Sequence, residues 1–125
     1  MGVVIREGKK KDLPSALELI KELAEYENAL HEVSNTVVQM EKDGFGEDPI
    51  YKFIVAEEEE DVVGMSMYYY RYSTWKGKNL YLEDLVVTAS KRGSGIGKLL
   101  LDETIAIAKR TDCTGIIWQV LDWNK

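Results

Sequence analysis

The segment Lys91–Lys98 has the residue types and the spacing of a loop that binds phosphate groups. Its sequence is Lys-Arg-Gly-Ser-Gly-Ile-Gly-Lys, and a strongly helical stretch follows it. Glycine has no Cβ, so the backbone can turn sharply there and expose its N–H groups. Exposed N–H groups at the positive end of a helix dipole attract phosphate oxygens, and the side chains of Arg92 and Lys98 add positive charge. The sequence therefore predicts a site for a phosphate-bearing ligand.

Three phosphate-binding patterns can be compared with this loop. A Walker A loop fails at both ends, because Arg92 stands at its first glycine and Leu99 at its hydroxyl position. A dinucleotide fingerprint fails because its third glycine comes one residue too soon, at Gly97. The pattern that remains is Arg-x-x-Gly-x-Gly, formed by Arg92, Gly95 and Gly97. A glycine-rich helix start without any ligand is the alternative.

The elements that must hold this loop follow the order β-α-α-β-β-β-α-β. Apolar spacing of i, i+3, i+4 and i+7 predicts a first helix that begins after Asp12, its N-cap, and ends near Tyr26. An acidic run at 57–61 predicts a hairpin turn, and the helix after the glycine loop predicts a parallel crossover. We therefore expect a single domain over residues 1–125 with a mixed α/β (α+β) fold. The expected strands are 3–7, 50–56, 62–73, 80–87 and 115–121, and a second helix is expected from 35 or 36 to 40.

The pattern Arg-x-x-Gly-x-Gly, preceded by Leu85-Val86-Val87, resembles the cofactor motif of the Gcn5-related N-acetyltransferase (GNAT) family. The resemblance implies the acyl-CoA N-acyltransferase fold, in which helices flank a mixed central sheet. It implies acetyl-CoA as the acetyl donor, with the loop amides holding its pyrophosphate and backbone groups near 85–87 pairing with its pantetheine arm. The cofactor-binding residues that it implies are Leu85, Val86, Val87, Arg92, Gly93, Ser94, Gly95, Ile96, Gly97, Lys98 and Asn124.

Further blocks of the chain resemble the spermidine/spermine (diamine) N1-acetyltransferases within that family. The resemblance implies an N-acetyltransferase that moves an acetyl group from acetyl-CoA to a primary amine of a small polycationic acceptor, such as a polyamine or diamine. Relatives of this kind also acetylate thialysine or another small or peptide amine, and a non-catalytic acyl-CoA-binding module is a further alternative. The blocks are spread over most of the chain, at Ile20–Glu27, Asp43–Pro49, Gly64–Tyr72, Trp75–Lys78 and Leu80–Asp84.

Glu83 and Asp84 are the candidate catalytic carboxylates. An alkylammonium group has a pKa of about 10, so it must lose a proton before its nitrogen attacks a thioester. Adjacent strand residues point to opposite faces unless a bulge intervenes, and the resemblance implies a bulge just beyond this pair. We expect Glu83 to accept the proton through water and Asp84 to hold the cation or support the site. By resemblance, Tyr26, Glu27 and Trp75 complete the acceptor pocket, with ordinary packing in a loop as the alternative for Trp75.

The C-terminal end of the sequence departs from the family pattern. In that pattern an Asn after the fifth strand, matched here by Asn124, opens a further helix that is followed by two strands. The tyrosine expected to protonate the leaving thiolate belongs to that helix, and the sequence stops at Lys125. We therefore expect a C-terminally incomplete domain that lacks the last helix and strands. Either the sequence is a fragment, or the missing half-site is supplied from elsewhere, for example by a partner chain. Dimers are common in the resembled subfamily, so a homodimer is possible.

Composition and charge restrict the expected partners. The net charge is −6 and no stripe of Lys and Arg is long enough to follow phosphates, so nucleic acid is not expected. No apolar run approaches the ~20 residues of a membrane span, so no membrane is expected. The single cysteine, Cys113, cannot form an internal disulfide, which favours a reducing cytoplasm. His31 has no companion ligands, so we expect no metal; the expected partner is a small cationic amine.

Overall fold

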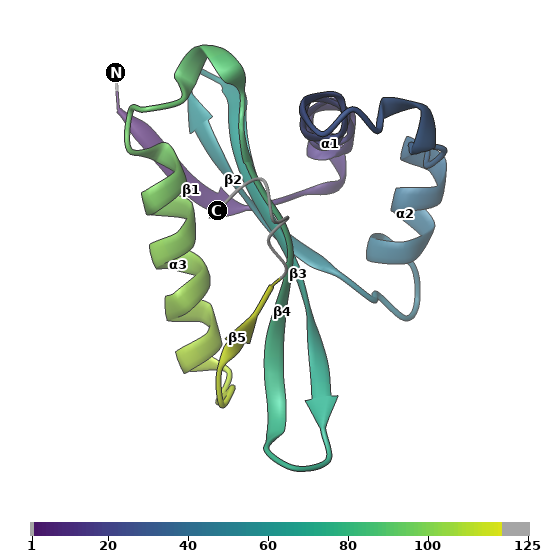
Figure 1. Cartoon of the computed structure of the whole chain (residues 1–125), viewed down its shortest axis with the longest axis vertical. Helices are drawn as coiled ribbons and strands as arrows, with labels where there is room; N and C mark the ends of the chain where they lie inside the picture. Colours follow the sequence, from purple (N-terminus) through teal and green to yellow (C-terminus); the bar gives the residue numbers. More distant parts are fainter. Residues whose placement is uncertain (1, 119–125) are drawn as a thin grey trace.

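The elements follow the predicted order in this computed structural model, which describes residues 2–118 (Figure 1). Five strands form one sheet in the spatial order β1-β2-β3-β4-β5. The first three strand pairs are antiparallel and β4 pairs with β5 in parallel, which confirms the mixed sheet. The strands are β1 Val3–Glu7, β2 Lys52–Glu58, β3 Asp61–Ser73, β4 Gly77–Val87 and β5 Ile116–Ile117, and the helices are α1 Leu13–Tyr26, α2 Val37–Phe45 and α3 Ile96–Arg110. Residues 119–121, expected at the end of the fifth strand, lie outside the described part.

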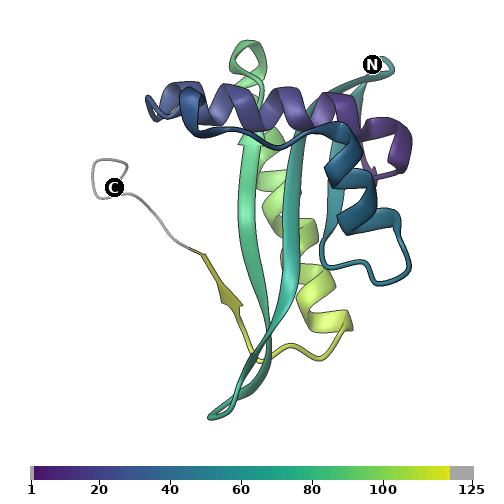
Figure 2. The same ribbon diagram turned by 90° about the vertical axis from the view of Figure 1, so that its right-hand side faces the viewer.

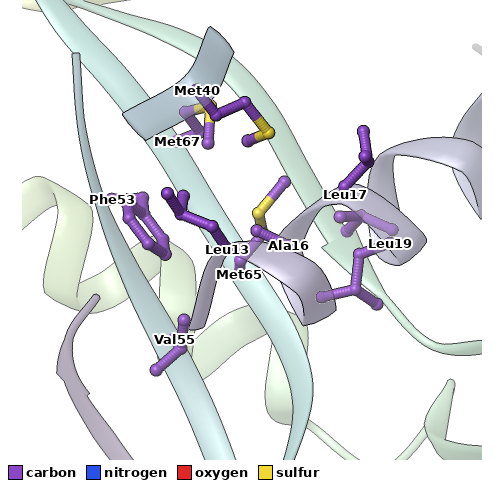
Figure 3. Close-up of a cluster of buried hydrophobic side chains, with 10 residues drawn as sticks. Leu13, Ala16, Leu17, Leu19, Met40, Phe53, Val55, Met65 and Met67 are labelled. Atoms are coloured by element: carbon purple, nitrogen blue, oxygen red, sulfur yellow. The ribbon is translucent and has the colours of Figure 1, made fainter. Parts of the chain in front are cut away.

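The sheet has a hydrophobic core on each face. α1 and α2 cover one face and α3 covers the other (Figure 2). β3 serves both cores, since Met65 and Met67 point to the α1 side while Ser66 and Tyr68 point to the α3 side. Its residues 63–68 are all buried, as expected for a central strand covered on both faces. The α1-side core, shown in Figure 3, consists of Leu13, Ala16, Leu17, Leu19, Met40, Phe53, Val55, Met65, Met67 and Val86.

Helix α3 has a threonine on its buried face. Apolar spacing predicts Leu99 and Ile105 on this face, yet Leu99 is 46% exposed and Thr104 is fully buried. The Thr104 hydroxyl donates to the carbonyl of Leu100 at 2.8 Å and lies 2.7 Å from the hydroxyl of Ser66. Because these polar groups satisfy one another, a polar residue can occupy the core. The buried face is therefore rotated from the one that the apolar residues alone indicate.

Helix α2 runs past the point at which the sequence predicts its end. Gly44 is predicted to stop the helix after Met40, but the helix continues through it to Phe45. The ring of Tyr51 packs directly against Gly44, where a Cβ would come within 2.3 Å of it. The Tyr51 hydroxyl also donates to the carbonyl oxygen of Met40 at 2.6 Å. Gly44 thus permits a close approach to β2 and does not end the helix.

A largely buried ion pair joins β1 to the start of α1. Arg6 donates two hydrogen bonds to the Asp12 carboxylate, at 2.8 and 3.0 Å, and a third to Glu57 of β2 at 3.0 Å. The Asp12 side chain is 5% exposed, and the Arg6 guanidinium lowers the pKa of its carboxyl. Asp12 stands at the N-cap of α1 as predicted, but its side chain does not cap that helix. The carboxylate is already engaged by Arg6 and by the backbone N–H of Lys9.

Replacing Asp12 with Asn should lower the free energy of unfolding by about 2–3 kcal/mol, because it leaves a poorly solvated guanidinium without its main partner. The loss should begin to shrink below about pH 4, where the carboxyl of the unfolded chain takes up a proton, and should vanish only below the lowered pKa of the folded carboxyl. Urea unfolding at neutral and acidic pH measures both effects. Glu103→Gln removes the more exposed pair with Arg110 and should cost less than about 1 kcal/mol. Equal losses for the two variants would contradict the role assigned to Asp12.

Candidate active site

A β-bulge in β4 places Glu83 and Asp84 on one face of the sheet. In the β3–β4 register Tyr68 faces Leu82 and Met67 faces Asp84, so Glu83 is an extra residue with no partner on β3. The resemblance implies a bulge just beyond this pair, whereas the bulge lies at Glu83 itself. Leu82 belongs to the α3-side core, while Asp84 faces Met67 of the α1-side core. The bulge thus turns both carboxylates toward the α1 side, where an unbroken strand would have separated them.

The negative charges of Glu83 and Glu27 act on Asp84 at this bulge. Burial, followed by the negative charges of Glu83 and Glu27, raises the pKa of Asp84 to about 6. Glu27 directly follows the last residue of α1, so the C-terminal end of that helix reaches the bulge. Within residues 2–118, none of the three carboxylate groups accepts a hydrogen bond or forms an ion pair. Clustered negative charge of this kind is stabilised by a bound cation, so the bulge is a candidate site for an alkylammonium group.

The Arg92–Lys98 loop has the backbone geometry that its glycines predict. Gly93 and Gly95 have φ values of +83° and +89°, in the left-handed region that glycine adopts without strain. A Cβ at either position would meet no atom within 4 Å, so the conformation and not the space requires glycine. Gly95 is the N-cap of α3, and the N–H groups of the next three residues have no acceptor within the helix. These N–H groups can bind an anion.

Carboxylates hold two of the cationic side chains around this loop. The ammonium of Lys98 lies 2.8 Å from Asp102, one turn further along α3. The ammonium of Lys91 lies 2.6 Å from Glu58 at the end of β2. The Ser94 hydroxyl donates to the carbonyl oxygen of Lys91, which closes the loop on itself. The backbone N–H groups are therefore the fixed positive elements of the loop.

A cavity of about 240 Å³ lies between α1 and the end of β4. Its lining comes from Leu23 and Tyr26 of α1, Leu85–Val87 of β4, and Arg92 of the loop. Arg92 donates to the carbonyl of Val87 at 3.2 Å, and its guanidinium lies 5.4 Å from the ring centre of Tyr26. The structure therefore brings four residues predicted to bind the cofactor to one cavity. Tyr26, predicted for the acceptor pocket, lies on the same cavity.

β4 parts from β5 close to this cavity. Within the described residues the two strands pair only at Leu80–Ile116 and Tyr81–Ile117. Figure 2 shows the β5 arrow leaning away from β4. The edge of β4 over residues 82–87 therefore has no neighbouring strand in the described part of the chain. Such an edge offers its backbone N–H and C=O groups to an extended ligand.

Glu22 of α1 is a positioning residue that the sequence pattern does not single out. Its carboxylate accepts a hydrogen bond from the Thr88 hydroxyl at 2.8 Å and another from the Ala89 N–H at 3.1 Å. These bonds tie α1 to the chain that leads from β4 into the glycine loop. Glu22 sits among the polar positions of an amphipathic helix, and its partners are 66 and 67 residues away. No local signal could have identified it.

The structure does not bring every predicted site residue to this centre. Trp75 lies in the turn between β3 and β4, at the opposite end of the hairpin from the glycine loop, and is 93% exposed. Asn124 lies outside the described residues. Among residues 2–118, no three His, Cys, Asp or Glu side chains are grouped so as to hold a metal ion. Over the same range, no helix combines the length and the apolar character needed to cross a membrane.

Sequence comparisons connect the chain with acetyltransferases. Residues 16–125 match the model of the acetyltransferase (GNAT) family. The chain is 43% identical over 131 residues to the thialysine N-epsilon-acetyltransferase of Bos taurus, covering 98% of this chain and 77% of that protein. It is 39% identical over 128 residues to the spermidine/spermine N(1)-acetyltransferase-like protein 1 of Homo sapiens, covering 97% of this chain and 18% of that protein.

Solved structures share this fold. An integron cassette protein from the mobile metagenome of V. cholerae matches with a TM-score of 0.78 at 26% identity, over 99% of this chain and 78% of that one. An aminoglycoside acetyltransferase from an uncultured soil metagenomic sample, in complex with sisomicin, matches with a TM-score of 0.80 at 20% identity. The match covers 98% of this chain and 80% of that one. The fold is that of the acyl-CoA-dependent acyltransferases. This chain belongs to the GNAT acetyltransferase family, whose members use acetyl-CoA, and is an acetyl-transferring enzyme.

Replacing Asp84 with Asn should stabilise the protein by on the order of 2 kcal/mol above about pH 7. The folded-state pKa of about 6 lies above the ordinary 3.8, so the folded protein loses stability as the pH rises through this interval. The gain should become small at about pH 3, where the carboxyl is protonated in both states. Chemical unfolding at about pH 7 and at about pH 3 measures this gain in stability. The variant Asp48→Asn, in an exposed loop, is the control. An Asn variant no more stable than wild type at neutral pH would contradict the burial of a charged Asp84.

Proposed function

We propose that this enzyme transfers an acetyl group from acetyl-CoA to a terminal primary amine of a small cationic acceptor, such as a polyamine or diamine. The observation that carries the proposal is the action of the Glu83 and Glu27 charges on the partly buried Asp84, beside a stretch of β4 that has no second neighbouring strand within residues 2–118. An alkylammonium ion supplies the positive charge that these carboxylates lack. The net charge of −6 also attracts cations to the protein surface.

The residues present fit acetyl-CoA, which supplies an activated acetyl thioester when bound. We assign its pyrophosphate to the N–H groups of the 92–98 loop and the start of α3. The positive φ values of Gly93 and Gly95 support this assignment, because they let the loop turn sharply into the start of α3, whose first N–H groups have no acceptor within the helix. We assign the pantetheine arm to the edge of β4 at Leu85–Val87, supported by the cavity of about 240 Å³ that these residues line. Arg92, held beside Val87, adds a cation next to the same cavity.

The acceptor must lose a proton before its nitrogen can attack the thioester. Asp84 is partly buried, whereas Glu83 is exposed to solvent. We therefore assign cation binding to Asp84 and Glu27, and proton acceptance through water to Glu83, from which the proton can leave to bulk solvent. Transfer is then direct, from the thioester to the amine. Cys113 takes no part, because it follows the C-terminal end of α3 while the loop precedes its N-terminal end.

Thialysine is the second candidate acceptor, and the names of the relatives favour it. The matching proteins of Bos taurus, Sus scrofa and Mus musculus, each covering 97–98% of this chain, are thialysine N-epsilon-acetyltransferases. Thialysine presents the same terminal primary amine as a diamine, so the carboxylate cluster can serve both. For this site, thialysine and a diamine differ at the end of the molecule that lies away from the reacting amine.

Release of free coenzyme A thiol from acetyl-CoA tests this proposal, with spermidine, spermine, putrescine, thialysine and a peptide amine as separate acceptors. We expect turnover with at least one small cationic amine. Glu27→Gln should raise the KM of that amine about tenfold, because it removes one of the charges that hold the ammonium. Glu32→Gln, whose carboxylate is 73% exposed beyond α1, should leave the KM unchanged. Binding of acetyl-CoA without turnover of any acceptor would contradict the proposal.

A further inference from the structure

Three pairs of opposed residues follow one another along the α1-side face of the β3–β4 hairpin. Residues two apart on a strand share a face, so the pairs form a continuous row. α1 crosses this face near the bulge, and no helix of the described part crosses it further along the hairpin (Figure 2). From the bulge outward, the pairs are Met67 with Asp84, Tyr69 with Tyr81, and Arg71 with Asn79.

The middle pair is an aromatic wall. The rings of Tyr69 and Tyr81 stack with their centres 5.1 Å apart and their planes 25° apart. Both side chains are partly exposed. Burial, and after it the nearby charge of Glu83, raises the pKa of Tyr69, which places the wall next to the carboxylate cluster. An aliphatic stem can lie against such rings.

The outer pair carries polar groups without partners. Arg71 is exposed, and its guanidinium makes no hydrogen bond or ion pair within residues 2–118. Asn79 is only 5% exposed, and its side-chain oxygen has no hydrogen-bond partner there. A buried amide oxygen without a donor is uncommon in folded proteins, and a bound ligand is one source of the missing donor. This end of the row therefore places an exposed cation opposite a buried acceptor without a partner.

We propose that Arg71 and Asn79 recognise the α-carboxylate and α-ammonium groups of an amino acid whose side chain ends in the reacting amine. The Arg71 guanidinium binds the carboxylate, and the Asn79 side-chain oxygen accepts a hydrogen bond from the α-ammonium. The stem lies along Tyr69 and Tyr81. This inference rests on the part of the proposed function that places the reacting amine at Asp84, and among the two candidate acceptors it favours thialysine. A diamine, with a second ammonium in place of the amino-acid group, meets Arg71 as a like charge and is disfavoured.

The spacing along the strands fits an acceptor of lysine length. Arg71 lies four residues from Met67, the partner of Asp84, which corresponds to roughly 13 Å at about 3.3 Å per residue. A lysine-like acceptor spans roughly 8 Å from its terminal nitrogen to its carboxylate, given bonds of about 1.5 Å. The side chains of Arg71 and Asp84, with their hydrogen bonds, cover the remaining distance. Tyr69 lies midway, two residues from each end.

Two acceptors that differ only in the carboxylate test this inference: thialysine and its decarboxylated counterpart, bis(2-aminoethyl) sulfide. We expect wild-type kcat/KM to favour thialysine by about tenfold or more, because the carboxylate gains a charge-assisted contact. Arg71→Gln should lower kcat/KM for thialysine about tenfold and leave that of the diamine unchanged or higher. Arg71→Lys should keep part of the preference, since it keeps the charge but loses the planar fork.

Arg110→Gln is the matched control, because Arg110 lies on α3 and pairs with Glu103. It should leave the preference between the two acceptors unchanged. An equal effect of Arg71→Gln on both acceptors, or a wild-type preference for the diamine, would overturn the inference while the proposed function stands. Absence of turnover with every amine would remove both. Thermal melting of each variant shows whether any loss comes from unfolding instead.

Discussion

The extra residue in β4, Glu83, decides most of what this site can do. An unbroken strand would send Glu83 and Asp84 to opposite faces, whereas the bulge brings both to the α1 side, near Glu27. Within residues 2–118, β5 pairs with β4 only up to Tyr81, two residues before the bulge, so an edge without a second neighbouring strand in that range begins beside the carboxylates. One irregularity thus places an acidic cluster next to backbone groups that an extended ligand can use. β3 and β4, the two longest strands, hold it in register.

Helix α1 connects the stability of the fold with the geometry of the site. Its start is fixed by the bonds between Asp12 and Arg6, and its apolar side packs into the core shown in Figure 3. Further along, Glu22 holds the chain that leads into the glycine loop, and Glu27 completes the carboxylate cluster. A shift of this one helix would disturb the cavity at Tyr26 and the acidic cluster together. We infer that the ion pair at its start also protects the site.

Local signals made the element order, the hairpins and the glycine loop predictable. Gly95, for example, adopts the left-handed backbone that glycine accepts without strain. What depends on pairing between distant segments could not be predicted. The resemblance implies a bulge just beyond Asp84, but its position at Glu83 follows from the register with β3. The bonds of Glu22 depend on partners 66 and 67 residues away, and the facing of Arg71 and Asn79 depends on the same hairpin register. No periodicity or composition of the sequence indicates any of these three features.

Amide hydrogen exchange with and without acetyl-CoA tests most directly the central claim that the free edge of β4 and the start of α3 form the cofactor site. We predict slower exchange on ligand addition for residues 82–87 and 93–98, and little change in α2. Gly95→Val should lose this protection, because valine is strained at a φ of +89°. Protection confined to another region, such as the cavity between Ile5 and Ile107 on the α3 side, with none at 82–87 or 93–98, would contradict the account.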